Sequence, residues 1–171
     1  MTTFPFSPFA PSSLRSPALP AFPAAPLAPA VPFARLNDSL SLLNPEGLYD
    51  PRPNGYSHVA LVEGPVRIVY VSGQGGEDAA GCLPLDFPRQ VARAMHNLRI
   101  ALQAAGADVG DVAKLTVLVV DHSHDRLRTF GAALREMWGD RPTPACTLIP
   151  VPRLALDNML FEIEATAVLP A

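Results

Sequence analysis

The most regular pattern in the chain is an alternation of apolar and polar side chains near its C-terminus. Phe161 and Ile163 alternate there with Glu162 and Glu164. Because successive side chains of a strand point to opposite faces, the two carboxylates leave the apolar face together. The pattern predicts a strand over Met159–Val168 with one buried face.

Further segments have the composition of strands. Ala145–Val151 is a β-type run, and Lys114–Val120 is a continuous β-branched and apolar run typical of a central strand. Tyr56–Val62 and Val66–Ser72 alternate on either side of Glu63-Gly64-Pro65. This arrangement predicts that the two segments pair as a hairpin.

Two segments with apolar residues at spacings of three and four predict helices. The first follows Asp86, a residue type that caps helix N-termini, and closes at Gly106. Its charged side includes His96, which we expect on the surface. The second runs from about Asp125 to Trp138. Its predicted buried stripe is Leu127, Phe130, Leu134 and Met137.

In chain order these segments are β-β-α-β-α-β-β. The turn-rich stretch from Leu36 to Asn54 is predicted as an irregular lead-in to the first strand. Two helices can cover one face of a mixed sheet, so the pattern predicts an α+β sandwich. A chain of 171 residues has room for one good core. We therefore expect one folded domain over residues 36–171.

Residues 1–35 differ from the rest in composition. Prolines stand at positions 5, 8, 11, 17, 20, 23, 26, 29 and 32, which would share one edge of a polyproline II helix. A basic leader region is missing and the prolines interrupt any apolar run, so we expect no signal peptide. Two interpretations stay open. Residues 5–32 are an arm for a proline-binding partner, or the segment is a disordered tail or the product of an over-assigned start.

Charge and cysteine content narrow the classes of function. The chain has 13 Lys and Arg against 16 Asp and Glu, which does not favour a nucleic-acid or membrane partner. Cys82 and Cys146 lie far apart with no CxxC pairing. This spacing indicates free thiols in a cytoplasmic protein rather than a disulfide scaffold.

Two local groups of residues could carry chemistry, and each has a structural alternative. His122 and His124 would point the same way in an extended segment, as metal ligands do, but the loop also offers Ser123 as a helix cap. Cys146 with a histidine such as His58 could form a nucleophilic pair if its pKa were lowered. A free cysteine is more often a small buried side chain. We favour the structural interpretation of both groups.

Several motifs occur together from about Asn44 to the end of the chain. Pro-Ala-x-Thr at 144–147 precedes a Glu-Ile-Glu-Ala strand at 162–165, and Tyr56 stands in NGYSHV. Ser72-Gly73-Gln74 stands in YVSGQGG, and the segments VARAMHNLRIALQAAGAD and VAKLTVLVVD follow. This combination resembles the RidA (YjgF/UK114) superfamily of enamine/imine deaminases.

The resemblance implies roles for individual residues. The carboxylate of Glu162 would place the attacking water, Tyr56 would line the pocket, and Gly73 would let backbone groups meet the substrate. Cys146 and Thr147 would contact the substrate after the Pro-Ala pair. Without the resemblance, Glu162 would be interpreted as a solvated acid on a strand.

The chain departs from the family pattern at one position. In active members the residue after Pro-Ala is an arginine that holds the substrate carboxylate, and here it is Cys146. Arg153 or Arg67 could supply a cation from another direction. The departure points to a substrate other than the usual 2-imino acids.

The resemblance also implies the assembly and the class of reaction. Members pack as homotrimers with their sheets turned inward and clefts between subunits, and they use no metal or organic cofactor. We expect hydrolysis of a small reactive enamine or imine. The alternatives are a non-catalytic trimer that binds a small metabolite and, less favoured on charge, an RNA-cleaving or translation-inhibiting protein.

Overall fold

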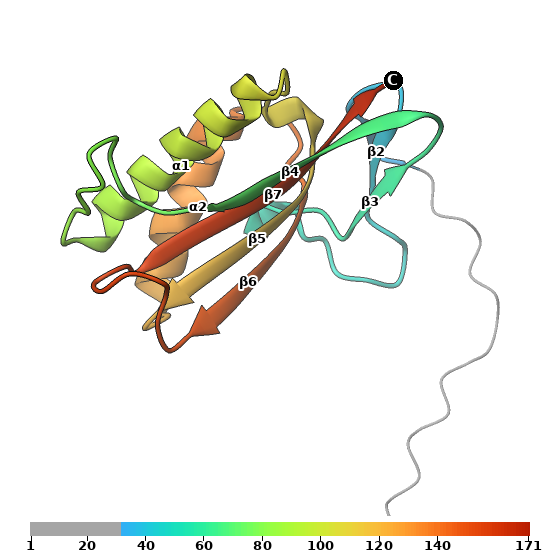
Figure 1. The fold of residues 1–171 in the computed structure, drawn as a ribbon. Coiled ribbons are helices and arrows are strands. Elements are labelled where there is room, and N and C mark those ends of the chain that lie inside the picture. Colours follow the sequence, from blue (N-terminus) through green and yellow to red (C-terminus); the bar gives the residue numbers. More distant parts are fainter. Residues whose placement is uncertain (1–31) are drawn as a thin grey trace, which may run out of the picture.

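The computed structural model describes residues 32–171, in which two helices cover one face of a four-stranded mixed sheet (Figure 1). The predicted α+β class is thereby confirmed. The predicted N-terminal segment 1–35, including the proposed arm, lies outside the described residues except for 32–35. The elements are β1 (Ala34–Arg35), β2 (Leu40–Leu43), η1 (Arg52–Asn54), β3 (Val59–Val62), β4 (Val66–Gln74), α1 (Phe87–Ala104), η2 (Val109–Asp111), β5 (Val112–Val120), α2 (His124–Trp138), β6 (Ala145–Val151) and β7 (Phe161–Pro170).

The main sheet has the strand order β4-β7-β5-β6. β7 lies antiparallel to both β4 and β5, whereas β6 lies parallel to β5. The helix α2 connects β5 to β6 along the chain. The register places Leu118 opposite Glu162 and Thr116 opposite Glu164. Both glutamates therefore lie on the face of the sheet that the helices leave open.

A second, three-stranded sheet corrects two of the predictions made from the sequence. β2 forms within the stretch predicted as irregular, and β3 pairs with β2. β1 pairs with the other edge of β2 and lies just before that stretch, within the segment 1–35 that was predicted as a tail. β3 and β4 therefore do not pair as a hairpin, although Glu63-Gly64-Pro65 joins them. The cause is contact between segments that are distant in sequence. β4 pairs along its length with β7, and Leu40 packs with Val168 between the two sheets.

Capping fixes both helices close to their predicted ends. The Asp86 carboxylate accepts a hydrogen bond from the Arg89 amide at 3.0 Å, and Gly106 adopts a φ of 75° after the last turn of α1. The Ser123 hydroxyl accepts from the Arg126 amide at 3.2 Å at the start of α2. Leu127 was wrongly predicted as buried. It is 42% exposed because it lines a cavity beside β6.

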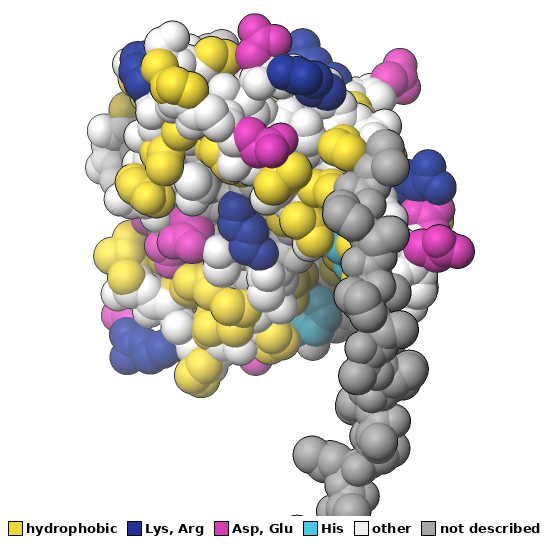
Figure 2. All heavy atoms as spheres, turned by 90° about the vertical axis from the view of Figure 1, so that its right-hand side faces the viewer, with side chains coloured by type: hydrophobic (Ala, Val, Ile, Leu, Met, Phe, Trp, Pro, Cys, Tyr) yellow, Lys and Arg dark blue, Asp and Glu magenta, His cyan; other side chains and the backbone are white. Residues whose placement is uncertain are grey.

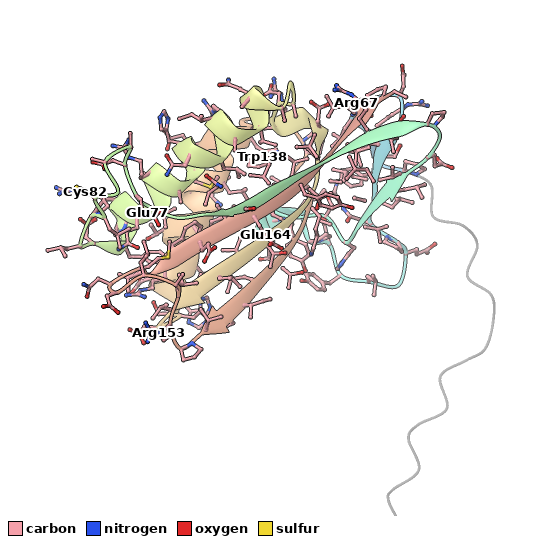
Figure 3. All side chains as sticks on the ribbon, in the orientation of Figure 1. Arg67, Glu77, Cys82, Trp138, Arg153 and Glu164 are labelled. Atoms are coloured by element: carbon pink, nitrogen blue, oxygen red, sulfur yellow. The ribbon has the colours of Figure 1, made fainter. Side chains whose placement is uncertain are left out.

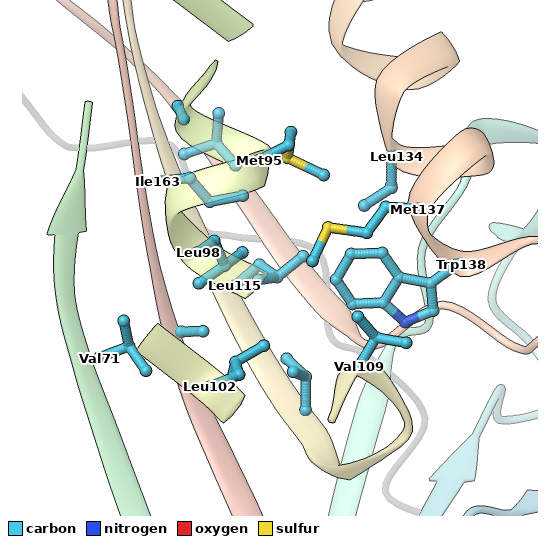
Figure 4. Packing of buried hydrophobic residues seen from close by; sticks show 14 of the residues in the cluster. Val71, Met95, Leu98, Leu102, Val109, Leu115, Leu134, Met137, Trp138 and Ile163 are labelled. Carbon is cyan, nitrogen blue, oxygen red and sulfur yellow. The ribbon is translucent and has the colours of Figure 1, made fainter. Parts of the chain in front are cut away.

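The core lies between the helices and the covered face of the sheet. Figure 4 shows Leu98 of α1 and Trp138 of α2 directed toward Leu115 and Ile163 of the strands. Leu98, Leu115 and Ile163 have no exposed surface, and burying a side chain of this size stabilises a fold by roughly 1.5–3 kcal/mol. The core thus holds β5 and β7, and with them the residues on the opposite face, in a fixed register.

On the side that carries β2 and β3, the visible surface of residues 32–171 bears side chains of both charges. Figure 2 shows apolar, basic and acidic side chains interspersed over this side. None of the helices between residues 32 and 171 combines the length and hydropathy needed to cross a membrane.

Candidate functional site

Glu162 and Gly73 lie against each other on β7 and β4. The β4–β7 register shifts between Val71 and Gln74, so β4 bulges at Gly73. A Cβ added at position 73 would overlap the Glu162 carboxylate. Only glycine at this position leaves the carboxylate its space, which gives Gly73 a role beyond that of a generic turn residue.

The Glu162 carboxyl has an unusual electrostatic setting. Its pKa is raised above the usual range, first by burial and then by repulsion from the carboxylates of Glu77 and Glu164. A carboxylate with a raised pKa is a better proton acceptor at neutral pH than an ordinary surface acid. The setting fits a group that binds a water molecule and exchanges a proton with it.

Packing beneath the strand holds Glu162 in place. The neighbouring Phe161 is fully buried, and its ring centroid lies 5.9 Å from that of Phe87 and 5.6 Å from that of Phe130. Ile163 on the other side is also fully buried. Because both neighbours are fixed in the core, Glu162 is presented on the open face with little freedom of its backbone.

Two amides on α1 order the loops around this carboxylate, and the sequence analysis did not identify them. Gln90 is fully buried, donates to the carbonyls of Pro84 and Asn158 at 2.7 and 2.8 Å, and accepts from the Leu160 amide at 2.8 Å. Asn97 donates to the carbonyls of Gly75 and Glu77 at 3.0 and 2.8 Å. The signal available in the sequence was helical spacing. Each amide lies one turn from the apolar residue at position 94, which itself lies one turn from the apolar residue at position 98.

Cys146 lies on the opposite face of the sheet from Glu162. It pairs with Leu115, which is fully buried on the helix side, and it packs against the same core cluster. It lines a cavity of about 650 Å³ between α2 and β6, together with Tyr56. Cys146 and Glu162 of one chain therefore cannot contact the same small molecule.

The predicted pair of Cys146 with His58 is not supported by the structure. Burial raises the pKa of the Cys146 thiol to about 11, an effect that the charge of Lys114 opposes only in part. His58 does not line the cavity, because its Nε2 contacts the Tyr49 carbonyl at 2.8 Å. A nucleophilic thiol needs a lowered pKa, so the structure favours a neutral thiol.

The remaining predicted residues, Tyr56 and Thr147, lie in different surroundings. The Tyr56 ring packs edge-on against Tyr49 and His58, and the two tyrosine hydroxyls share a hydrogen bond. Thr147 lies at the edge of the cavity, but its hydroxyl accepts a hydrogen bond from Lys114 on the open face. The predicted residues thus form two groups, with Glu162 and Gly73 apart from Tyr56 and Cys146.

The remaining predictions concern metals and alternative cations. Residues 32–171 contain no group of three His, Cys, Asp or Glu side chains that could hold a metal, and the pair His122 and His124 is exposed. Figure 3 places Arg67 and Arg153 at opposite ends of the sheet. Arg153 pairs with Asp157 at 3.4 Å, and neither arginine lines the cavity beside Cys146.

Comparison with known proteins connects this geometry to a family. The model of the family described as endoribonuclease L-PSP matches residues 50–169. A 2-iminobutanoate/2-iminopropanoate deaminase of Rattus norvegicus is 40% identical over 117 residues, which cover 66% of this chain and 79% of the relative. A putative reactive intermediate deaminase, TdcF of Escherichia coli K12, is 32% identical over 59% of this chain and 78% of its own.

Solved structures agree with the sequence comparisons. A Rid-family protein of unknown function from Yersinia pestis, YyfB, is 34% identical and superimposes with a TM-score of 0.72 over 77% of this chain and 99% of its own. TdcF of E. coli, solved with bound serine, is 28% identical with a TM-score of 0.54 over 60% of this chain and 80% of its own. With its α+β layout and its Gly73–Glu162 and Pro-Ala-Cys-Thr segments in place, the chain belongs to the RidA family.

Proposed function

We propose that the protein hydrolyses a small reactive imine or enamine in a cleft shared by two subunits of a homotrimer. The observation that carries the proposal is the division of the predicted residues. Glu162 with Gly73 forms one half-site on the open face, and Cys146 with Tyr56 forms the other in the cavity beside α2. A neighbouring chain that supplies the complementary half would complete the site.

The chemistry needs few groups. Glu162 accepts a proton from a water molecule as the oxygen of that water attacks the imine carbon, and returns the proton to the nitrogen, which gives a neutral carbinolamine. Glu162 then accepts the carbinolamine hydroxyl proton and passes it to the nitrogen as the C=O bond forms and the C–N bond breaks, so that a carbonyl compound and ammonia are released. The raised pKa of Glu162 suits both proton transfers, because a group titrating closer to neutral pH can accept and return a proton.

The open face of the sheet supports the proposed assembly. Ile68, Tyr70 and Ile149 point away from the helices and are 50%, 78% and 41% exposed. Apolar side chains on one sheet face are usually covered by another element or another chain. We expect Tyr70→Glu to reduce the size of the particle measured by light scattering and to abolish hydrolysis, whereas a wild-type monomer would contradict the shared cleft.

The neutral Cys146 gives the substrate a different anchor from that of arginine-bearing members. A guanidinium holds a carboxylate through two charge-assisted hydrogen bonds, each contributing about 1.5–3 kcal/mol. We therefore expect small 2-imino acids to be poor substrates of the wild type. Cys146→Arg should improve their hydrolysis, because the cavity of about 650 Å³ has room for the longer side chain.

RNA cleavage, which the family description names, is not favoured by this site. Glu77, Glu162 and Glu164 lie close enough to raise one pKa, and such a group of carboxylates repels phosphates. A non-catalytic role in binding small molecules is the alternative that the same geometry accommodates. A variant that lacks the proposed base, Glu162, distinguishes this binding role from catalysis, because only catalysis requires the base.

The test is an imine-hydrolysis assay. An amino-acid oxidase generates 2-imino acids in the presence of semicarbazide, and the protein lowers the rate of semicarbazone formation if it hydrolyses them. Glu162→Gln should abolish this effect, while the matched control Glu164→Gln, on the same face two residues away, should retain it. Equal activity of wild type and Glu162→Gln on every imine that is turned over would contradict the proposed base.

A further inference from the structure

The cavity between α2 and β6 has walls of a distinct kind. Phe130, Leu134 and Leu148 contribute apolar surface, and Arg128 and Arg135 contribute charge. Its volume of about 650 Å³ falls within the range of small-molecule sites. An apolar wall with a few charged groups at its edge suits a ligand that has an apolar body and one polar end.

The charges around this cavity are of one sign. No Asp or Glu of the described residues 32–171 lines it, and the thiol of Cys146 is neutral because burial raises its pKa to about 11. Arg128 pairs with the carboxylate of Asp125. A ligand that enters the cavity therefore meets positive charge with no acidic side chain in the lining to compete for it.

Arg135 is the cation of this cavity whose side chain has no ion-pair or hydrogen-bond partner among residues 32–171. Six arginines between residues 32 and 171 form ion pairs with aspartates, and Arg135 is not among them. One of its guanidinium nitrogens lies 3.5 Å from the position that a Cβ of Gly131 would occupy. Gly131 itself lines the cavity, so the guanidinium lies along the cavity wall, where the described part of the chain offers no acceptor to its donors.

We infer that this cavity binds an acid with a bulky apolar group, and that Arg135 holds its carboxylate. The apolar group, branched or aromatic, would lie against Phe130, Leu134 and Leu148. The inference rests on the proposed function, since it takes the cavity as one half of the substrate site. It assigns Arg135 as a residue that determines specificity toward larger acids.

Binding of stable acids tests the inference without turnover. The ligand is 4-methyl-2-oxopentanoate, titrated into the full-length protein by calorimetry, with pyruvate as the small acid and 4-methyl-2-pentanone as the neutral molecule of similar shape. We expect the branched acid to bind about tenfold more tightly than either. Absence of binding by the branched acid at about 10 mM would overturn the inference.

Two variants assign the effect to one arginine. Arg135→Gln should weaken binding of the branched acid about tenfold and leave the ketone unchanged, because only the charged hydrogen bonds are lost. Arg99→Gln, on the exposed side of α1 and outside the cavity, should change neither. Equal losses in the two variants, or an equal loss for acid and ketone, would overturn the assignment.

The outcome is separable from that of the proposed function. If no imine is hydrolysed but the branched acid binds in an Arg135-dependent way, the cavity binds its ligand and the proposed chemistry fails. If imines are hydrolysed and Arg135→Gln leaves the KM for branched and small 2-imino acids unchanged, the chemistry stands and the role of Arg135 is wrong.

Discussion

Replacing Gly73 with alanine tests the contact that positions Glu162. The added Cβ would lie 2.6 Å from Cδ and 2.9 Å from Cγ of Glu162, whereas ordinary contacts begin at 3.4 Å. The carboxylate must therefore move by about 1 Å, and a displacement of this size from the reacting geometry costs about 100-fold in rate. Glu162 is only partly buried, so it can move without disturbing the core.

The expected result is a loss of activity with little loss of stability. Gly73→Ala should lower kcat/KM for any imine that the wild type hydrolyses by about 100-fold. It should change the free energy of unfolding by no more than about 1 kcal/mol, because no buried side chain is removed. The control is Gly110→Ala, where an added Cβ meets nothing within 4 Å and φ is not positive.

A double variant shows whether the loss of activity in Gly73→Ala arises from its effect on Glu162. Residues that act as a unit give non-additive effects, so Gly73→Ala combined with Glu162→Gln should be no less active than Glu162→Gln alone. Steady-state assays of the four proteins in this cycle measure the coupling. Additive losses, or full activity of Gly73→Ala, would refute the view that Gly73 serves to make space for the carboxylate.

Three further predictions concern other parts of the site. Gln90→Ala should lower the free energy of unfolding in urea by about 2–4 kcal/mol, because it removes three part-buried hydrogen bonds that the fully buried Gln90 side chain makes with backbone groups; a change below 1 kcal/mol would be inconsistent with this account. At pH 7.5 Cys146 should react with iodoacetamide about 100-fold more slowly than a cysteine with a pKa of 9.0, whereas the exposed Cys82 should react first in peptide mapping. Activity should fall as pH falls through the raised pKa of Glu162, and Glu77→Gln should move this limb of the pH–rate profile to lower pH; an upward shift would contradict the stated repulsion.

The parts of the fold with strong local periodicity could be predicted from the sequence. The alternation at Phe161–Pro170 and the stripe of α1 each identify one element and its buried face. The short strands β1 and β2 of the second sheet could not, because they form only where distant segments meet. β2 has four residues and is held by Leu40 and Leu42, both fully buried.

The predicted hairpin fails for a related reason. Alternation in Tyr56–Val62 and Val66–Ser72 shows that each segment can be a strand, but it does not identify the partner. The partner of β4 is β7, about a hundred residues later in the chain, where Val71 meets Ala165. Local turn chemistry at Gly64 is the same whether or not the strands that it joins belong to one sheet.

The individual site residues could be named from the family resemblance, but their division could not. The motifs identify both Glu162 and Cys146 as site residues, but they do not indicate which face of the sheet each residue occupies. The amides of Gln90 and Asn97 carry no motif, since their partners are mostly backbone carbonyls of loops that are distant in sequence. Such contacts become visible only when the helix has been placed beside those loops.

The division itself follows from a single property of the central strand. Cys146 pairs with Leu115 and Glu162 pairs with Leu118, and these two positions on β5 differ by three. Side chains alternate along a strand with a period of two, so an odd difference puts the two residues on opposite faces. Moving either pairing by one residue would bring them together but would also expose the apolar face that forms the core. The core therefore fixes a register in which one chain presents two half-sites, and under the proposed function catalysis requires a second chain.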